Sequence, residues 1–591
     1  MKSPLKLAIS RTFGATCSVS EANPPASTPS IFGRLNLGEP SALFWLAFAG
    51  VLIALVAYPI AHLLLASVQV GPNDTFGLAN FAGAFGRTRQ INSIINTIAM
   101  GVAVVLVAAA FAIPLAWAVS RTDMPARGFI RILVLSAYVM PPYLLAIAWI
   151  LLAGPNAGWI NRLWMAVGGS APLINIFSFA GLVFIMAAHL FFLMFVFTSS
   201  ALDLVSSEIE DAAGILGSGT WRTLRRITLP LVLPALLAGG ILTFLQAIAL
   251  FGVPALISLP ARFPVMATQL WEFFEYPPRI GQAAAYSLPL LLITALLIGL
   301  QRKLLGRRGF TSVSGKGGER RIIRLGIWRW PMFFYALLIG TLTVFLPLLV
   351  ILQAAFAKAW ARGWSIDNFT LQNFHYVLFE HTAAQRGLTN SLLFGASSAI
   401  LALVLAFVAA YVIDRKLVPF GGLLNFLCTA PVVIPGIVLA IGFYAAYAGP
   451  PLALYGTSLL LILAFTTRFL PVAFANSAAA LRSINPEMEQ AVRILGGSRF
   501  TGIRRVMAPL LKRSLFGSLI LVFVPASQEL STAIFLTGPN TTVVSVVLLN
   551  LSEEGNLEAL AVLGSLLLAI TTIVVGVSWA LLGRDFMVRG N

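Results

Sequence analysis

Residues 44–68 read FWLAFAGVLIALVAYPIAHLLLASV, an apolar block without a single Asp, Glu, Lys or Arg. Because a helix needs about 20 residues to cross the hydrocarbon core of a bilayer, this block predicts a transmembrane helix. Similar blocks recur along all 591 residues, of which 59% are hydrophobic and 10% are charged. Soluble domains carry roughly a quarter charged residues, so this composition excludes a soluble enzyme. The sequence therefore predicts an all-α polytopic membrane protein.

Loop charges predict the orientation of the chain, because cytoplasmic loops of membrane proteins collect Lys and Arg. With the N-terminus in the cytoplasm, 30 of the 39 Lys and Arg residues fall in cytoplasmic segments and eight in external loops. Both termini are therefore expected to be cytoplasmic, and the net charge of +18 needs no nucleic-acid partner. Twelve spans are predicted, near residues 42–68, 92–119, 128–153, 179–201, 231–258, 283–301, 331–356, 389–413, 422–448, 456–481, 511–537 and 558–583.

A basic stretch from Arg302 to Arg329 separates six spans from six and predicts a cytoplasmic linker. The chain contains no G-x-x-x-x-G-K-[ST] pattern, so any ATP is expected to bind to another subunit. Four segments are predicted: a cytoplasmic tail (1–40), a first transmembrane domain (41–301), the linker (302–330) and a second transmembrane domain (331–585).

The two halves align as an internal repeat. The offset is 294 residues early in each half and 279 later, and the difference falls in the external loop after the third span. Matched landmarks with a change of loop length on one face indicate duplication. Since six spans is an even number, the repeats should be related by a pseudo-twofold axis along the membrane normal. The landmark pairs are Trp117 and Tyr411, Arg121 and Arg415, Pro141 and Pro435, Gly217 and Gly496, and Pro230 and Pro509.

The loop after the fourth span begins SSEIEDAAGILG at residues 206–217. Ser207 with Glu210 three residues later predicts a capping box, and Gly217 predicts a left-handed helix end. The expected helix of about nine residues is too short to span the bilayer.

The loop after the tenth span offers Asn485 as N-cap, Pro486 as first helical residue and Gly496 as terminator. A short helix of this kind can lie on the membrane surface or dock into a groove of a partner. Two such helices at equivalent places favour a docking surface that is presented twice to two copies of one partner.

These loops resemble the EAA loop of binding-protein-dependent ABC importer permeases, with the pattern E-A-A-x-x-x-G, nine residues, then I-x-L-P. The first half matches except for Asp in place of Glu, and the second half departs at Gln490, Val492 and Ala508. Docking of the second loop is therefore expected to be weaker. The residues that carry the resemblance are Glu210, Asp211, Ala212, Ala213 and Gly217 in the first loop and Glu489, Gln490, Ala491 and Gly496 in the second.

The resemblance implies a transport subunit of a bacterial inner membrane that is not itself an enzyme and needs no cofactor. Its two loop helices would act as coupling helices, seated in clefts of two ATP-binding ABC subunits on the cytoplasmic side. A periplasmic binding protein would deliver the substrate, and membrane lipids would surround the spans. Rocking of the two halves would then give alternating access.

Two fused six-span halves in one chain resemble the ferric-iron permeases, and thiamine and aminoalkylphosphonate permeases are built similarly. Residues 529–532 and 251–254 look like that group. The spans show no cluster of Tyr, His or carboxylate that would suit iron, so no metal site is predicted in this chain. Ferric iron is the first candidate substrate, and thiamine, aminoalkylphosphonate or another small solute is the alternative.

Two charged residues, Arg468 and Glu529, lie within predicted spans at similar depth. Because a lone charge in the bilayer is costly, we hypothesise that they form an ion pair facing the interior. The first-half equivalents, His189 and Leu250, cannot form it. The pair is either a structural bridge or part of the substrate path. An ion-coupled secondary transporter is the alternative from another class, but it would not need two repeated cytoplasmic loops.

Overall fold

The computed structural model describes residues 40–71, 75–205, 207–306, 322–485 and 487–582. Within these ranges the chain is almost entirely helical, and its sheet is a two-stranded antiparallel hairpin that pairs Gln69 with Phe76. The predicted all-α class is therefore confirmed.

The first half begins with a kinked helix and ends with the long helix α14. Its elements are α1 (Pro40–Leu52), η2 (Ile53–Ala57), α2 (Tyr58–Val68), β1 (Gln69–Val70), β2 (Thr75–Phe76), α3 (Ala79–Phe85), α4 (Thr88–Arg121), α5 (Arg127–Ser136), α6 (Pro142–Ala153), α7 (Trp159–Ala166), α8 (Phe179–Leu204), α9 (Ser207–Ile215), α10 (Thr220–Thr223), η3 (Leu224–Thr228), α11 (Leu229–Ala249), α12 (Gly252–Ile257), α13 (Met266–Glu272) and α14 (Ile280–Gly306).

The second half repeats this order. Its elements are η4 (Gly326–Trp328), α15 (Arg329–Gly340), η5 (Thr341–Phe345), α16 (Leu346–Ala355), η6 (Trp360–Arg362), η7 (Ile366–Asn368), α17 (Gln372–His375), η8 (Tyr376–Glu380), α18 (Thr382–Asp414), α19 (Gly421–Thr429), η9 (Ala430–Val433), α20 (Gly436–Tyr447), α21 (Ser458–Arg482), α22 (Glu487–Ile494), α23 (Arg499–Gly502), η10 (Ile503–Met507), α24 (Ala508–Ser527), α25 (Ala533–Leu536), α26 (Val544–Glu553) and α27 (Leu557–Leu582).

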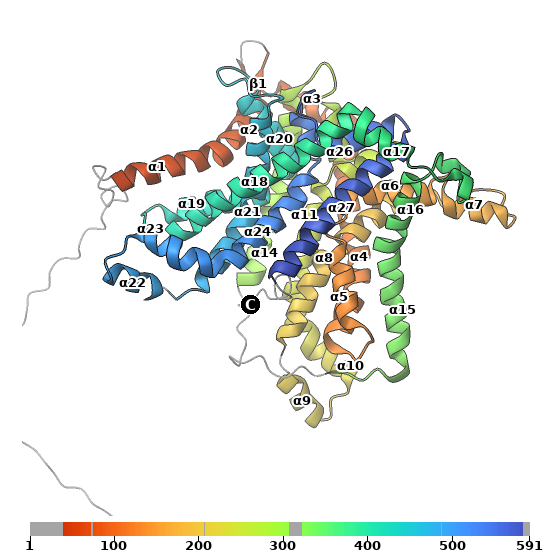
Figure 1. The fold of residues 1–591 in the computed structure, drawn as a ribbon, viewed down its shortest axis with the longest axis horizontal. Helices are drawn as coiled ribbons and strands as arrows, with labels where there is room; N and C mark the ends of the chain where they lie inside the picture. Colours follow the sequence, from red (N-terminus) through yellow and green to blue (C-terminus); the bar gives the residue numbers. More distant parts are fainter. Residues whose placement is uncertain (1–39, 72–74, 206, 307–321, 486, 583–591) are drawn as a thin grey trace, which may run out of the picture.

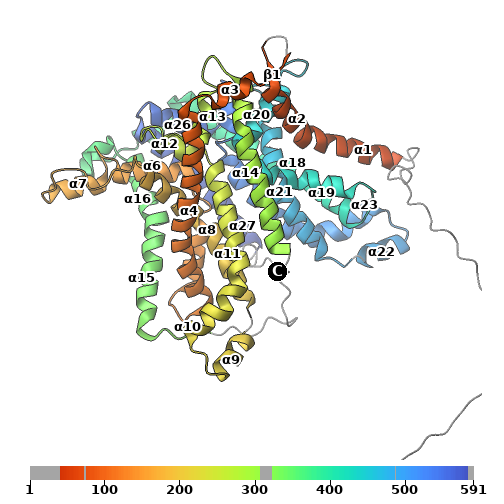
Figure 2. The same ribbon diagram turned by 180° about the vertical axis from the view of Figure 1, so that it is seen from behind.

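Ten helical stretches among the described residues are long and apolar enough to cross a bilayer, and the bent pair α19–α20 would make eleven. The short loop helices α9 and α22 protrude on the side opposite to β1 and α3, and they lie well apart from each other (Figures 1 and 2). The arrangement therefore places the two sequence-predicted loops on one side of the bundle.

Two of the predicted spans, 128–153 and 422–448, are not continuous helices. α5 ends at Ser136 before α6 starts at Pro142, and α20 is bent by 116° from the helical segment before it. Pro141 and Pro435 lie at these breaks with ψ of 135° and 145°, outside the helical range. Proline lacks a backbone N–H and its ring clashes with the preceding turn, so it interrupts the helix. Two of the twelve predicted spans, at equivalent places in the two halves, are therefore broken helices.

The fifth and eleventh spans also differ from the prediction of helices over 231–258 and 511–537. The helices run from Trp221 to Ala249 and from Phe500 to Ser527 instead. A π-helical turn precedes Pro230 and Pro509, and the N–H of Leu229 donates to the carbonyl of residue 224 five residues back. The wider turn lets each helix begin before its proline and continue through it.

The first span of each half packs between the last span of its own half and the broken span of the other. α2 contacts α14 and α20, and α16 contacts α27 and α6. The lower part of the first span of the second half follows this exchange, since α15 stands beside α4 and α5 (Figures 1 and 2). The domain boundaries at 41–301 and 331–585 stay a prediction from the repeat, because the packing interleaves the two segments.

Tyrosine hydroxyls bridge the halves at carbonyls that prolines leave without a helical donor. Tyr335 donates to the carbonyl of Ala110, four residues before Pro114, at 2.7 Å. Tyr138 donates to the carbonyl of Leu521, four residues before Pro525, at 3.1 Å. Backbone groups inside a bilayer must find partners within the protein, and at Pro114 and Pro525 the opposite half supplies the donor.

The carbonyls before Pro59 are filled in the same way. Tyr447 donates to the carbonyl of Ala54, and the hydroxyl of Thr467 reaches the carbonyl of Leu55 at 3.3 Å. Both donors come from the second half, whereas the acceptors lie in the first. The proline kinks thus hold the two halves together.

We predict that Tyr138→Phe lowers the stability of the detergent-solubilised protein by about 1 kcal/mol, because it leaves the Leu521 carbonyl unbonded. The second variant Tyr138→Phe with Pro525→Ala should regain stability, since residue 525 then supplies an N–H to that carbonyl. Thermal unfolding of the two variants measures this. A double variant no more stable than Tyr138→Phe would contradict the assignment.

Candidate coupling site

Helix α9 ends at Gly217 in a left-handed turn. The N–H of Ser218 donates to the carbonyl of Ala213 at 2.9 Å, and the N–H of Gly217 to that of Gly214 at 3.0 Å. These two bonds form a Schellman motif, which needs positive φ at the terminating residue. Gly217 has φ of 79°, so its predicted role as helix terminator is confirmed.

Helix α22 ends in the same way at Gly496, which has φ of 80°. The N–H of Gly497 donates to the carbonyl of Val492 at 2.9 Å. At the start of the helix the side-chain oxygen of Asn485 accepts the N–H of Glu487 at 3.0 Å, so Asn485 is the N-cap that the sequence predicts. The two loop helices therefore share their geometry.

The capping box predicted for Ser207 needs the Ser207 side chain, and the first-turn role predicted for Pro486 needs that residue. Both lie outside the described part of the chain. The carboxylate of Glu210, the other member of the predicted box, contacts two elements beyond its own helix.

Glu210 is buried, at 6% exposed, where the ends of α4 and α8 meet the turn before α11. Its Oε2 lies 3.4 Å from Nη1 of Arg121, and the hydroxyl of Thr228 donates to its Oε1 at 2.7 Å. Nη2 of Arg121 also donates to the carbonyls of Leu202 at 2.6 Å and Val205 at 2.8 Å. One buried guanidinium at the end of α4 thus ties together α4, the end of α8 and α9.

Glu489 occupies the equivalent place in the second half and is 8% exposed. Its Oε2 lies 2.8 Å from Nε of Arg415 at the end of α18, and its Oε1 accepts the hydroxyl of Tyr411. Arg415 also pairs with its neighbour Asp414 at 2.7 Å. The same arginine–glutamate contact therefore holds α22 on the end of α18.

The hydroxyl donor differs between the halves. In the first half it is Thr228, whose equivalent Met507 has no hydroxyl, and in the second it is Tyr411, whose equivalent Trp117 has none. Each carboxylate nevertheless keeps one arginine and one hydroxyl partner. Breaking a buried ion pair by removing one partner costs roughly 3–5 kcal/mol, so both pairs anchor their loops firmly.

The outward faces of the two loops are apolar at equivalent positions. The first motif buries Ala213, at 8% exposed, and exposes Asp211 and Ala212, while Gln490 and Ala491 are exposed in the second. Large apolar side chains this exposed on a loop helix and at the first residue of the following helix form a candidate docking surface. We call these two sets the docking triads: Ile215 (87% exposed), Leu216 (87%) and Trp221 (74%) in the first loop, and Ile494 (85%), Leu495 (87%) and Phe500 (69%) in the second.

Each half of the chain matches one protein family, the binding-protein-dependent transport system inner membrane component, over residues 112–310 and 402–586. The chain belongs to this family. The chain is 24% identical over 535 residues to the ferric transport system permease protein FbpB of Actinobacillus pleuropneumoniae, covering 88% of this chain and 75% of that one. It is 29% identical over 230 residues to a protein provisionally named as a 2-aminoethylphosphonate transport system permease from Salmonella paratyphi A, covering 39% of this chain and 86% of that one.

The double match, together with the relative that aligns over 88% of this chain, confirms the predicted family and its fused two-repeat type. The chain is thus a multi-pass membrane subunit of an ABC importer. As a permease component it is not itself an enzyme.

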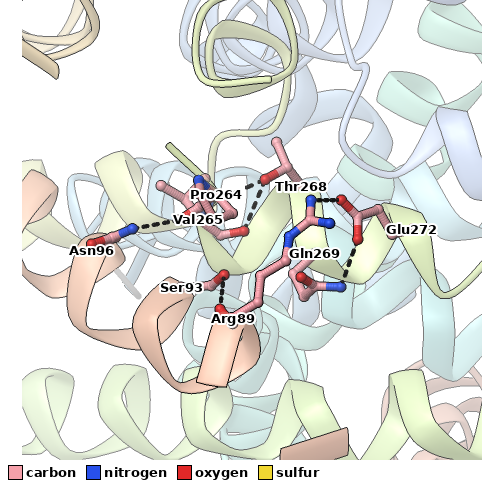
Figure 3. A network of polar contacts seen from close by, with 8 residues as sticks. All are labelled: Arg89, Ser93, Asn96, Pro264, Val265, Thr268, Gln269 and Glu272. Atoms are coloured by element: carbon pink, nitrogen blue, oxygen red, sulfur yellow. Dashed lines mark hydrogen bonds and ion pairs between the residues drawn. The ribbon is translucent and has the colours of Figure 1, made fainter. Parts of the chain in front are cut away.

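At the opposite end of this permease, helix α13 is fastened to the start of α4 by a polar network (Figure 3). Asn96 donates to the carbonyl of Pro264 at 2.9 Å, and Thr97 accepts the N–H of Met266 at 2.8 Å. Arg89 pairs with Glu272 across the two helices. The other residues in the view are Ser93, Val265, Thr268 and Gln269.

The second half has the matching attachment of α26 to α18. Asn390 donates to the carbonyl of Thr542 at 2.9 Å, and Ser391 accepts the N–H of Val544 at 2.9 Å. α4 has 34 residues and α18 has 33, so each is about 50 Å long at 1.5 Å per residue. Each of these two long helices is held at one end by a loop helix, α9 or α22, and at the other end by α13 or α26.

The structure forms the ion pair hypothesised from the two charges within spans. Nε of Arg468 lies 3.2 Å from Oε2 of Glu529, with side-chain exposures of 17% and 10%. Oε1 of Glu529 accepts the N–H of Thr532 at 3.0 Å. A Cβ added at Gly436, the first residue of α20, would lie 2.7 Å from Cζ of Arg468. The pair thus joins α21, the segment after α24 and the break before α20.

This segment lies where the halves of the permease meet. Gln528 donates to the carbonyl of Val139 at 3.0 Å, and Ser531 accepts the N–H of Phe251 at 3.3 Å. The ion pair therefore faces the interior of the bundle. Its role in transport stays a prediction.

The histidines do not gather into a metal site. His375 pairs with Glu380 at 2.9 Å on the surface, and His381 caps α18 by accepting the N–H of Ala384 at 3.0 Å. No group of three His, Cys, Asp or Glu side chains that could hold a metal ion exists among the described residues.

Sequence reasoning used Arg121 and Arg415 only as repeat landmarks and missed their role as anchors. It also missed the hydroxyl donors Thr228 and Tyr411. A polar residue that recurs at the end of an apolar span, opposite a matched acidic residue in the next loop, is the signal that could have found the arginines. The hydroxyls carry no such signal, because their positions do not match between the halves.

We predict that Gly217→Val weakens attachment of the ATP-binding subunits or transport-linked ATP hydrolysis, because a β-branched residue at positive φ costs roughly 1 kcal/mol or more. Nothing lies within 4 Å of a Cβ added at Gly217, so the effect is purely conformational. Gly217→Asn, which tolerates the left-handed region, is the matched control and should retain more activity. Gly496→Val should act more mildly. Normal uptake by Gly217→Val would show that the loop does not couple.

We predict that Glu529→Gln lowers thermal stability, because it leaves Arg468 without its counter-ion inside the bundle. Adding Arg468→Met should restore stability, since the amide oxygen of Gln still accepts the Thr532 N–H and no charge remains. Glu554→Gln, at an exposed site, is the control. If Glu529→Gln instead melts like the parent protein but does not transport, the pair belongs to the substrate path.

Proposed function

We propose that this chain forms both sides of the membrane pathway of a ferric-iron importer, driven by two ATP-binding subunits and fed by a periplasmic binding protein. The observation that carries the proposal is the pair of docking triads at equivalent positions of two loop helices. Each helix is anchored to a long span by a buried arginine–glutamate pair.

The docking triads would seat in clefts of the ATP-binding subunits. Small residues at Ala212 and Ala491 leave room for close helix contact, and the large side chains supply apolar area of the kind that helix-in-groove recognition uses. Glu210 and Glu489 point back into the permease, so they position the helices. Asp211 and Gln490, which are exposed beside them, would touch the partner.

The orientation that follows has both termini, the linker and the two loops in the cytoplasm. Two observations support it. Lys and Arg concentrate in those segments, and α9 and α22 lie on the side opposite to β1 and α3 (Figure 1). The external side would then carry the attachments of α13 and α26, where a periplasmic binding protein would dock.

Ferric iron is the proposed substrate because the fused two-half architecture and the relative named as a ferric transport permease agree. Aminoalkylphosphonate is the second candidate, supported by the relative with that printed name, and thiamine the third. An ion-coupled secondary transporter is disfavoured. The carboxylate within the bundle, Glu529, has Arg468 and Thr532 as partners, which suits a structural bridge better than ion coupling.

We predict ATP-dependent uptake of radioactive ferric iron into proteoliposomes that hold the permease with its cognate ATP-binding subunits and binding protein. Excess unlabelled ferric iron should compete, whereas thiamine and aminoethylphosphonate should not. Leu216→Ala with Trp221→Ala should reduce copurification of the ATP-binding subunits, and Leu163→Ala, an exposed residue of α7, is the matched control. Uptake of another solute would redirect the substrate assignment. Uptake without ATP-binding subunits would overturn the function.

A further inference from the structure

The described end of the linker between the halves is hydrogen-bonded to the residues beside Arg121, at the first coupling site. The N–H of Ile323 donates to the carbonyl of Arg121 at 2.8 Å, and the N–H of Asp123 donates to the carbonyl of Ile323 at 3.2 Å. Thr122 and Ile323 form a parallel bridge. The N–H of Leu325 donates to Oδ1 of Asp123 at 2.8 Å. Residues 322–325 thus lie along the turn that follows α4, and we call them the strap.

The turn that receives the strap is itself fixed. The hydroxyl of Thr122 donates to the carbonyl of Ala118 at 2.6 Å, and Nη1 of Arg127 donates to the carbonyl of Thr122 at 2.9 Å. Thr122 is fully buried. The strap is therefore bonded to a rigid part of the first half.

Arg121 stands between two contacts. Its side chain holds Glu210 of α9, and its main-chain carbonyl holds the strap. Four residues beyond Leu325 the chain enters α15, whose Tyr335 bonds to α4. A displacement of α9 can therefore reach the first span of the second half through a few bonded residues.

We propose that the linker is a mechanical part of the first coupling site, in which the strap transmits movement of α9 through Arg121 to α15 of the second half. This inference rests on the proposed function, since it assigns a role to α9 as a coupling helix. Arg121 and Asp123 are then positioning residues. Because the linker joins the two halves, the first loop is connected to both of them through bonded residues.

The second loop has no matching device in the described part of the chain. Arg415 holds Glu489 through its side chain, but within the described ranges no separate segment pairs with residues 415–417 that follow α18. The side chain of Arg121 is also the more buried, at 2% exposed against 14% for Arg415. Among the described residues the two coupling sites are therefore unequal, because the strap bonds only at the first.

Two variants test the strap without touching the Arg121–Glu210 pair. Ile323→Pro removes the N–H that bonds to Arg121, and Asp123→Ala removes the acceptor for Leu325. Each should lower substrate-stimulated ATP hydrolysis and uptake by about five- to tenfold, the factor that one lost hydrogen bond corresponds to. Copurification of the ATP-binding subunits should not change. Arg324→Ala, whose side chain is exposed on the same segment, is the control and should behave like the parent protein.

A cross-link supplies a second measurement in case Ile323→Pro fails to fold. Bridge partners lie about 5 Å apart, within disulfide range, so Thr122→Cys with Ile323→Cys should oxidise readily. Cys17 and Cys428 are replaced in this background, and a protease site within residues 310–318 lets a non-reducing gel report the bond. We expect the oxidised protein to keep most of its uptake, because the strap stays attached during the cycle.

The outcomes separate the two proposals. If the parent protein neither binds ATP-binding subunits nor transports, the proposed function fails. If the parent protein transports but Ile323→Pro and Asp123→Ala match it, or the cysteines do not cross-link, the strap proposal alone fails. Loss of uptake on oxidation would also overturn it, because the strap would then have to detach.

Discussion

A buried arginine–glutamate pair fastens a loop helix to the end of each second span, and the coupling proposed for this permease depends on this contact. The glutamates lie on loop helices too short to cross the bilayer, and the arginines end helices of about 50 Å. The outer ends of the same helices hold α13 and α26 through Asn96 and Asn390. A force on a loop helix would therefore act on a long helix, α4 or α18, that reaches the opposite face of the permease. Because separating buried charges is costly, we expect the loop helix and the long helix to move together.

The internal repeat gives two such long helices, α4 and α18, and the contacts at their ends differ between the halves. The hydroxyl that donates to each carboxylate comes from different places in the two halves. In the first half it is Thr228, at the end of the loop, and in the second it is Tyr411, on the span. Pro114 and Pro525, which lie within helices, provide contacts between the halves, because the carbonyls that they leave without a helical donor accept tyrosine hydroxyls from the opposite half. The strap of the linker is hydrogen-bonded to the end of α4 and the turn that follows it. The result is one bundle with interleaved first spans.

The sequence was sufficient for the fold class, the repeat, the loop motif and the ends of both loop helices, because apolar block length and glycine position act locally. It also led to the Arg468–Glu529 pair, since two charges at one depth have few alternatives in a bilayer. It failed where proline has two outcomes. Pro141 and Pro435 break their spans, whereas Pro230 and Pro509 follow π turns within continuous helices. The strap was equally invisible, because a bond between Ile323 and Arg121 joins segments about 200 residues apart through backbone groups that every residue carries.

A double-mutant cycle on Arg121 and Glu210 tests the central claim most directly. The measured quantity is substrate-stimulated ATP hydrolysis in proteoliposomes for Arg121→Met, Glu210→Gln and the double variant, at equal content of ATP-binding subunits. If the pair transmits the movement, each single variant loses most of the stimulation and the double variant is no worse than the poorer single one, because contacting residues are not additive. Single variants that keep full stimulation, or losses that simply add, would contradict the account.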